Sequence, residues 1–362
     1  MYSKFRLQNF RSFKDLELKD LTRVNLIAGK NNTGKTALLE AIAVYSGQYD
    51  PDILLRFKID EIRQQSHHRD IGLPSWNILF NEFDTQKPIR LFGKLPNVQQ
   101  QLPIFPESQA LEISVPKIDD IEKGSRVFKI SSRSDTIDTH LRTDIIQIKN
   151  EKYKAYLMIQ DEDRIYTDGI SLQRIPSIFL LSREKASFED SAKLFSHLQR
   201  ERKQAVILDA LKIIDERVTS LEILYDGYPP MIYAELGLKQ PMPIATMGDG
   251  FNRVFSLVLA MSAVQGGVLL IDEIENGLHY SIQTKIWKAI AKAAELFNVQ
   301  IFATTHSFEM IRAAQEAFKE TGEDDFRFYR LDRDPDTQDI EAVRYSPKTI
   351  DAAVRLEYEV RG

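Results

Sequence analysis

The chain has 362 residues, a formal net charge of −5, 28% charged residues and no cysteine, a size that suits one large domain with insertions or about two domains. The lack of cysteine excludes disulfide frameworks, thiolate nucleophiles and metal centres built on sulfur, and it fits a reducing compartment, for which we expect the cytoplasm. The mild acidity argues against a protein that coats nucleic acid by bulk charge, and the apolar runs are far shorter than the roughly 20 residues of a membrane span.

Residues 1–47 predict a strand, a turn, a second strand, a glycine-rich loop and a helix. Short β-type runs at 4–7 and 24–28 flank a polar, turn-like stretch at 14–22. The loop has the pattern Gly-x-x-x-x-Gly-Lys-Thr, in which backbone N–H groups surround phosphate oxygens. Lys35 would span the terminal phosphates and the Thr36 hydroxyl would ligate magnesium. The residues expected to bind nucleotide here are Gly29, Asn31, Asn32, Thr33, Gly34, Lys35, Thr36 and Ala37.

Residues 50–170 predict an antiparallel, β-rich subdomain or insertion, because short β-type pieces alternate with Pro, Gly, Asn and Asp. A buried-type run at 175–181 returns the chain to the main sheet. Residues 185–240 predict a short helical lobe, with one helix over 191–222 and a strand over 231–236. The pieces expected as strands in the β-rich part are 89–92, 111–115, 127–130, 145–148 and 153–159.

In residues 241–362, predicted helices alternate with predicted strands, which indicates a parallel sheet with crossovers. The apolar run 268–271 predicts a strand that is buried on both faces, and Asp272 and Glu273 follow it directly. Asp272 suits magnesium binding, and Glu273 suits orienting and deprotonating an attacking water. The other expected elements are helices over 252–265 and 280–297, and strands over 299–304, 326–331 and 340–345.

These motifs resemble the ATP-binding-cassette (ABC) type ATPases of the RecF, SMC and OLD-like group, which includes stand-alone AAA-family ATPases of bacterial anti-phage defence. Glu275–His279 resembles the D-loop of that class, which follows the catalytic glutamate. His306, at the end of a predicted strand, resembles its switch histidine. A lone histidine is more often structural, so this assignment depends on the neighbouring motifs.

The class also has a signature segment that caps the nucleotide of the opposite subunit, usually Leu-Ser-Gly-Gly-Gln. This chain lacks that string, but Thr246–Arg253 resembles the Met-Gly-Asp-Gly variant of the OLD-like branch. The resemblance implies nucleotide contacts from Gly248, Asp249 and Gly250, with an ordinary glycine turn before a helix as the alternative. Arg253 is expected to add charge or to pair with a carboxylate of the partner.

The segment Asn9–Phe13 resembles the opening Asn-Phe-Arg-Ser-Phe of RecF- and SMC-like ATPases. This implies that Arg11 approaches the nucleotide, and a solvated arginine in a turn is the alternative. A Q-loop is not identifiable, although Ser182-Arg183-Glu184 lies where one would be.

OLD-like nucleases append a TOPRIM domain, and residues 307–362 are too few to form one. We interpret Asp332 and Asp334 as part of a hairpin, and His67–Asp70 as polar surface rather than a metal site. The basic cluster at 197–203 is interpreted as a solvated amphipathic helix face, with phosphate-backbone binding as the alternative.

The resemblance implies an α/β P-loop NTPase of ABC/RecF-like type over residues 1–362, with ATP and Mg²⁺ as cofactors. It implies a homodimer or higher homo-oligomer that closes head to tail around ATP, with Glu273, His306 and Lys35 as catalytic residues. Hydrolysis should be slow, because such a site turns over only when the interface closes. The implied role is control of a separate nuclease or toxin effector in anti-phage defence. A DNA-binding repair ATPase and a scaffold without turnover are the alternatives.

Overall fold

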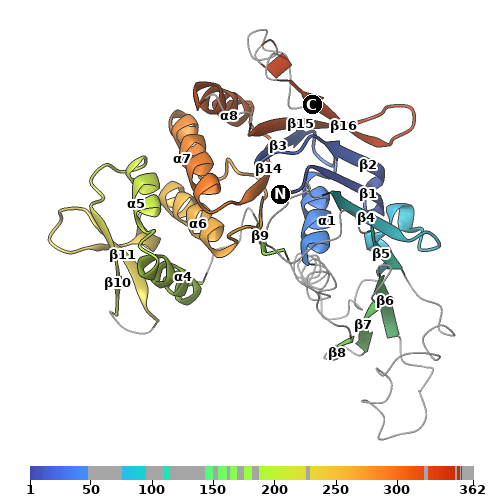
Figure 1. Cartoon of the computed structure of the whole chain (residues 1–362), viewed down its shortest axis with the longest axis horizontal. Helices are drawn as coiled ribbons and strands as arrows, with labels where there is room; N and C mark the ends of the chain where they lie inside the picture. The colour runs from blue at the N-terminus through green and yellow to red at the C-terminus, as the bar shows by residue number, and fades with distance from the viewer. Residues whose placement is uncertain are drawn as a thin grey trace, which may run out of the picture.

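The computed structural model describes residues 1–47, 76–94, 110–114, 143–149, 154–160, 164–168, 175–181, 187–225, 229–321, 325–346, 349–350 and 352. Within these ranges a central, mostly parallel sheet lies between helices, and a second, antiparallel sheet packs outside one helix (Figure 1). The predicted α/β class is therefore confirmed. Among the described residues, no helix combines the length and apolar character that crossing a membrane requires.

The central sheet has six strands in the order β16-β15-β3-β14-β13-β9. All neighbours are parallel except β15 and β16, which form the predicted hairpin. The parallel arrangement follows from the alternation of strands and helices along the chain. The strands are β3 (Val24–Gly29), β9 (Ser177–Leu180), β13 (Val268–Ile271), β14 (Gln300–Thr304), β15 (Phe326–Arg333) and β16 (Ile340–Tyr345).

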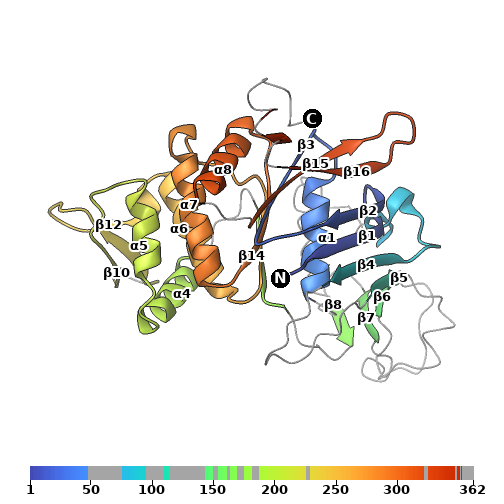
Figure 2. The same cartoon turned by 45° about the horizontal axis from the view of Figure 1, so that its top comes forward.

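Helices cover both faces of this sheet (Figure 2). Because successive side chains of a strand point to opposite faces, Leu270 packs with α1 (Lys35–Gly47) in one core. Leu269 and Ile271 lie in a second core with the helices of the other face. These are α6 (Asp249–Ala263), α7 (Gln283–Leu296) and α8 (Phe308–Thr321), and α8 was not predicted.

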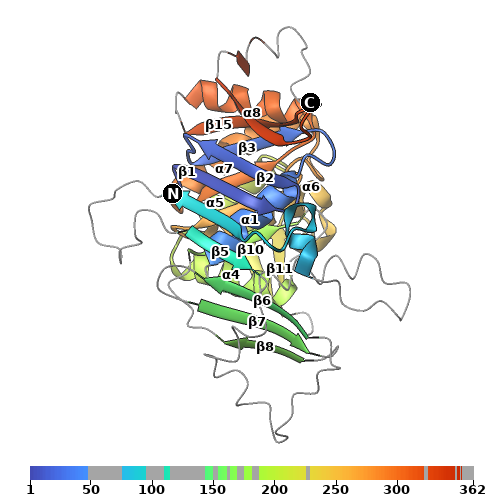
Figure 3. The same cartoon turned by 90° about the vertical axis from the view of Figure 1, so that its right-hand side faces the viewer.

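The second sheet is antiparallel, has seven strands in the order β2-β1-β4-β5-β6-β7-β8 and lies beyond α1 (Figures 2 and 3). The predicted turn over 14–22 is wrong, because Phe13–Lys19 forms a strand whose Leu16 and Leu18 point into the core. The strand expected at 127–130 lies outside the described residues. The strands are β1 (Lys4–Phe10), β2 (Phe13–Lys19), β4 (Ile89–Lys94), β5 (Ala110–Ser114), β6 (Thr143–Lys149), β7 (Lys154–Gln160) and β8 (Arg164–Asp168).

The lobe after β9 is mixed α/β, which corrects the single helix predicted over 191–222. That stretch divides into two helices and a strand, because the chain turns after the first helix at Arg202, where φ is +57°. Lys203 there pairs with Glu201 at 2.9 Å, as expected of a solvated helix end. The lobe consists of α4 (Phe188–Arg200), α5 (Ala205–Lys212), β10 (Ser220–Leu224), β11 (Met231–Glu235) and β12 (Met242–Pro243). Short 3₁₀ turns span Trp76–Leu79, Asn81–Phe83, Ile244–Thr246 and Tyr280–Ile282.

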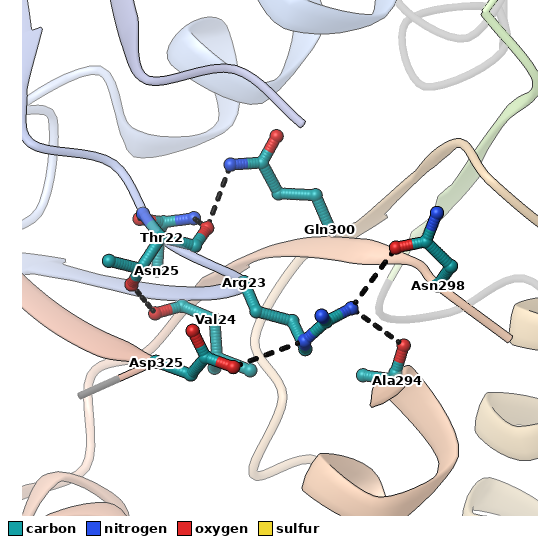
Figure 4. Close-up of polar contacts among 8 residues, drawn as sticks. All are labelled: Thr22, Arg23, Val24, Asn25, Ala294, Asn298, Gln300 and Asp325. Atoms are coloured by element: carbon teal, nitrogen blue, oxygen red, sulfur yellow. Dashed lines mark hydrogen bonds and ion pairs between the residues drawn. The ribbon is translucent and has the colours of Figure 1, made fainter. Parts of the chain in front are cut away.

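A polar network ties the amino ends of the central strands to the end of α7 (Figure 4). Arg23 donates to the Asp325 carboxylate at 3.3 Å and to the Ala294 carbonyl at 3.2 Å. Gln300 donates to the Thr22 carbonyl at 2.7 Å. These hydrogen bonds fix the amino edge of the sheet, which is the edge opposite to the phosphate loop.

Candidate nucleotide site

Three loops meet at the carboxyl edge of the central sheet. In the strand order, β14 lies between β3 and β13, and all three strands are parallel. The segments that follow Gly29, Ile271 and Thr304 therefore emerge side by side. Ligands of α/β proteins bind at such an edge. The fold thus brings together the phosphate loop, the two carboxylates and the histidine that are distant in sequence.

The phosphate loop is closely packed against the turn between β1 and β2. Gly34 has a φ of +80°, which favours glycine. A Cβ on Gly34 would contact the Ser12 hydroxyl and lie 2.7 Å from the Phe13 ring. On the other side of the loop, Arg333, the last residue of β15, donates to the Asn32 carbonyl at 2.9 Å. The loop backbone is therefore held from both sides.

Lys35 lies folded into the phosphate loop. Its ammonium donates to the carbonyls of Gly29 and Lys30, each at 2.8 Å, and its side chain is buried. Burial lowers the pKa of Lys35 from 10.5 to about 8, although the nearby Asp272 carboxylate acts in the opposite direction. The cost of burying the ammonium therefore outweighs the attraction of the nearby carboxylates.

Nucleotide binding should consequently take up protons at alkaline pH. Phosphate oxygens near Lys35 favour its charged form, so its pKa rises on binding from about 8, and affinity should fall as the pH rises above that value. Isothermal titration calorimetry in two buffers of different ionisation enthalpy measures this uptake. We expect about half a proton per nucleotide near pH 8 and almost none at pH 6.5, where Lys35 is already charged. Equal uptake at both pH values would contradict this assignment.

The Asp272 carboxylate accepts hydrogen bonds from two hydroxyl groups. Thr36 in the phosphate loop donates to Oδ2 at 3.0 Å, and Thr304 donates to Oδ1 at 2.6 Å. A hydroxyl and a carboxylate oxygen this close form a donor set of the kind that Mg²⁺ prefers. Among the described residues, no group of three or more His, Asp or Glu side chains gathers to hold a metal. The predicted roles of Thr36 and Asp272 as magnesium ligands fit this pair of oxygens and stay a prediction.

Glu273 is held in a left-handed conformation, with φ of +49°. Its N–H donates to the Thr304 hydroxyl at 2.9 Å, and Asn276 donates to its Oε2 at 2.7 Å. A non-glycine residue in this region of φ costs energy, and such residues cluster at functional sites. The contacts direct one carboxylate oxygen of Glu273 to Asn276 in the D-loop.

Glu275 fastens the histidine segment, a role that the sequence did not reveal. Its Oε1 accepts the N–H of His306 at 2.7 Å, which joins the D-loop to the end of β14. The predicted catalytic His306 is half-buried beside the same edge. Glu273 and His306 lie at the same edge because Glu275 binds the His306 N–H and Thr304 binds the Glu273 N–H. Their catalytic roles stay predictions.

The predicted signature segment lies at the N-terminus of α6 in this fold. Gly248 is the N-cap, is exposed, has a φ of +87° and has no side-chain capping bond. Gly250 packs against the D-loop of its own chain, since a Cβ there would lie 3.0 Å from the Gly277 carbonyl. Backbone N–H groups at an uncapped helix start are ready donors for an anion.

Arg253 contacts its own chain, and the expected added charge or pairing with a partner carboxylate stays a prediction. Its guanidinium donates to the carbonyls of Asp272 and Glu273 at 3.2 and 3.4 Å. Burial lowers the pKa of Arg253, and nearby carboxylates, with Asp272 first, oppose that shift. The side chain thus links α6 to the end of β13.

Arg11 approaches Glu40 of α1 at 2.6 Å, and both side chains are mostly buried. Its nucleotide contact stays a prediction, and this ion pair is an alternative to the solvated arginine. The segments Ser182–Glu184 and His67–Asp70, which were considered for a Q-loop and a metal site, lie outside the described residues. The Asp334 carboxylate accepts two backbone N–H groups within the β15–β16 turn, as a hairpin requires.

Comparisons with known proteins agree with this geometry. A family model described as "AAA domain, putative AbiEii toxin, Type IV TA system" matches residues 24–312. An "ATP/GTP phosphatase" of Helicobacter pylori (strain ATCC 700392 / 26695) is 22% identical over 355 residues, which are 88% of this chain and 89% of that protein.

Two solved structures share the fold. An SMC head bound to the C-winged helix domain of ScpA has a TM-score of 0.52 and 12% identity, over 95% of this chain and 97% of that one. An SMC head with an extended coiled coil, bound to the C-terminal domain of ScpA derived from Pyrococcus furiosus, has a TM-score of 0.50 and 10% identity, over 100% and 99%. The fold is therefore that of SMC heads, as the predicted ABC-type P-loop class requires.

Proposed function

Since this chain belongs to the AAA domain family whose model matches residues 24–312, we propose that it binds ATP with Mg²⁺ and hydrolyses it. The observation that carries the proposal is the 3.0 Å hydrogen bond between the Thr36 hydroxyl and the Asp272 carboxylate. A hydroxyl at the end of a phosphate loop and a carboxylate at the end of a neighbouring strand are the protein's ligands in a magnesium–nucleotide site.

Each residue at this edge then has its own role in ATP hydrolysis. Loop N–H groups and the start of α1 hold the phosphates, and Lys35 exchanges its two carbonyl partners for phosphate oxygens. Bound magnesium supplies charge neutralisation. Glu273 orients a water and takes its proton as the water oxygen bonds to the γ-phosphorus and the bond to ADP breaks. His306 is proposed to contact the departing γ-phosphate.

We further propose that two copies close head to tail around two nucleotides. The exposed, uncapped start of α6 supports this arrangement, because its donors have no side-chain cap in their own chain. Gly248, Asp249 and Gly250 of one copy would face the nucleotide that Lys35 and Glu273 of the other copy hold. Hydrolysis would then be slow, since it requires closure of the interface.

The proposed biological role is control of a separate protein effector, a nuclease or toxin, in the cytoplasm during anti-phage defence. The family description, which names a putative toxin of a Type IV TA system, supports a place in such a system, and control of a separate effector is our proposal beyond it. The SMC head that was solved with a domain of ScpA supports the view that this fold carries a partner protein.

Glu273→Gln protein, purified with ATP and magnesium from its native cells, tests that role. The variant is expected to hold the closed state, so a stoichiometric protein partner should co-purify and should remain after nuclease treatment. Lys35→Ala protein, which has lost the phosphate-loop charge, is the control and should lose the partner. Retention of DNA alone, lost when ATP is withheld, would contradict effector control and favour the DNA-repair alternative.

A further inference from the structure

Thr304 contacts three consecutive residues at the end of the neighbouring strand. It is the last residue of β14 and is completely buried. Its hydroxyl donates to Asp272 Oδ1 at 2.6 Å and accepts the N–H of Glu273 at 2.9 Å. Its carbonyl accepts the N–H of Ile274 at 3.0 Å. One side chain therefore contacts both of the residues to which the proposed hydrolysis assigns a carboxylate.

The two hydroxyl groups on Asp272 are not equivalent. Thr36 lies in the phosphate loop and is exposed, and its hydroxyl and Asp272 Oδ2, 3.0 Å apart, are the pair proposed to hold magnesium. Thr304 is buried in the core and donates to the other carboxylate oxygen, Oδ1. Thr304 would thus hold the carboxylate plane while Oδ2 is left to the metal.

The same hydroxyl supports the unusual backbone of Glu273. A φ of +49° at a non-glycine residue is strained and persists only where its surroundings hold it. The bond from the Glu273 N–H to Thr304 fixes the peptide that precedes the carboxylate. Without it, the Glu273 peptide has one contact fewer to keep the carboxylate facing the nucleotide.

We propose that Thr304 is a positioning residue that orients Asp272 toward the metal and Glu273 toward the attacking water at the same time. This inference rests on the proposed ATPase function. It assigns no contact between Thr304 and the nucleotide or the metal. Loss of its hydroxyl should therefore weaken metal binding and slow hydrolysis together, while nucleotide binding without metal stays unchanged.

Three substitutions separate the hydroxyl from the packing. Thr304→Val has the same shape without the hydroxyl, and Thr304→Ser keeps the hydroxyl. Thr305→Val is the matched control, because Thr305 is the next residue, is equally buried, and its hydroxyl accepts the N–H of Ser307 at 3.0 Å. Thr304→Ala removes the same hydroxyl and replaces Thr304→Val if the valine variant does not fold.

The first measurement is the affinity of Mn²⁺ for the ADP-loaded protein, by electron paramagnetic resonance. The second is ADP affinity in EDTA. We expect Thr304→Val to weaken Mn²⁺ binding about 10- to 100-fold, the range for residues that orient metal ligands. Thr304→Ser and Thr305→Val should stay within about threefold of wild type, and ADP affinity in EDTA should be the same in all variants.

Three outcomes would overturn the inference. Unchanged Mn²⁺ affinity in Thr304→Val, with normal ADP binding, would contradict it while leaving the ATPase proposal intact. An equal loss in Thr304→Val and Thr305→Val would assign the effect to packing. A wild-type protein that binds no nucleotide would overturn the proposed function, and this inference with it.

Discussion

Replacing Glu273 with glutamine should reduce ATP hydrolysis by about 10²- to 10⁴-fold while ATP binding stays close to that of wild type. Glutamine has the same shape and still accepts the hydrogen bond that Asn276 donates at 2.7 Å, so the local structure should persist. It does not accept a proton from water at neutral pH. The expected result is therefore a change in the hydrolysis rate with little change in affinity.

The measurement is phosphate release under single-turnover conditions, together with ATP affinity by calorimetry. Glu295→Gln is the matched control, because it makes the same chemical change at an exposed position on α7. It should hydrolyse ATP at the wild-type rate. Full activity in Glu273→Gln would show that another group deprotonates the water, and a parallel loss of ATP binding would indicate a structural role.

The local motifs could be predicted from the sequence because the residues of each motif are consecutive. The run 268–271 is buried at every position, as its four apolar residues predict. The placement of Thr36 beside Asp272 also followed, since parallel strands present their carboxyl ends at one edge. Those rules use only strand direction and the loop that follows each strand.

The hydrogen-bond partners of side chains on neighbouring strands could not be predicted from the sequence. Thr304 and Glu275 act on residues about thirty positions away, and their partners depend on which strand lies next to β13. The contact of Arg253 with backbone carbonyls of its own chain was also not predicted, because it depends on the packing of the first turns of α6 on the D-loop. Such contacts depend on packing, which spacing does not determine.

Two errors in secondary structure have a common origin. Residues 13–19 are rich in charged side chains and suggested a turn, but they form a strand with one solvated face. The Lys- and Glu-rich stretch 191–222 suggested one helix, whose last residues instead pair with β11. In both cases, tertiary pairing outweighs local composition.

Replacing Gly248 with aspartate should abolish hydrolysis without affecting ATP binding to the same chain. The position is exposed and has nothing within 4 Å of an added Cβ, so the change adds a carboxylate at the start of α6, together with backbone strain because φ is +87°. That charge would repel the phosphates of a nucleotide held by the second copy, and we expect it to slow hydrolysis at least as much as the loss of one oxyanion donor, about 10²- to 10³-fold. Gly237→Asp is the matched control, since Gly237 is also exposed, with a φ of +72° and open space, but lies between β11 and β12. It should hydrolyse ATP normally.

Phosphate release by a mixture of Glu273→Gln and Gly248→Asp proteins tests the head-to-tail site most directly. Each variant alone should be inactive, because both of its sites carry a defect. In a mixed dimer, one site combines an intact Glu273 from one chain with an intact Gly248 from the other. An equimolar mixture should recover about a quarter of the wild-type rate, since half of the dimers are mixed and each has one working site. No recovery on mixing, with both variants folded and binding ATP, would contradict a catalytic site shared between two copies.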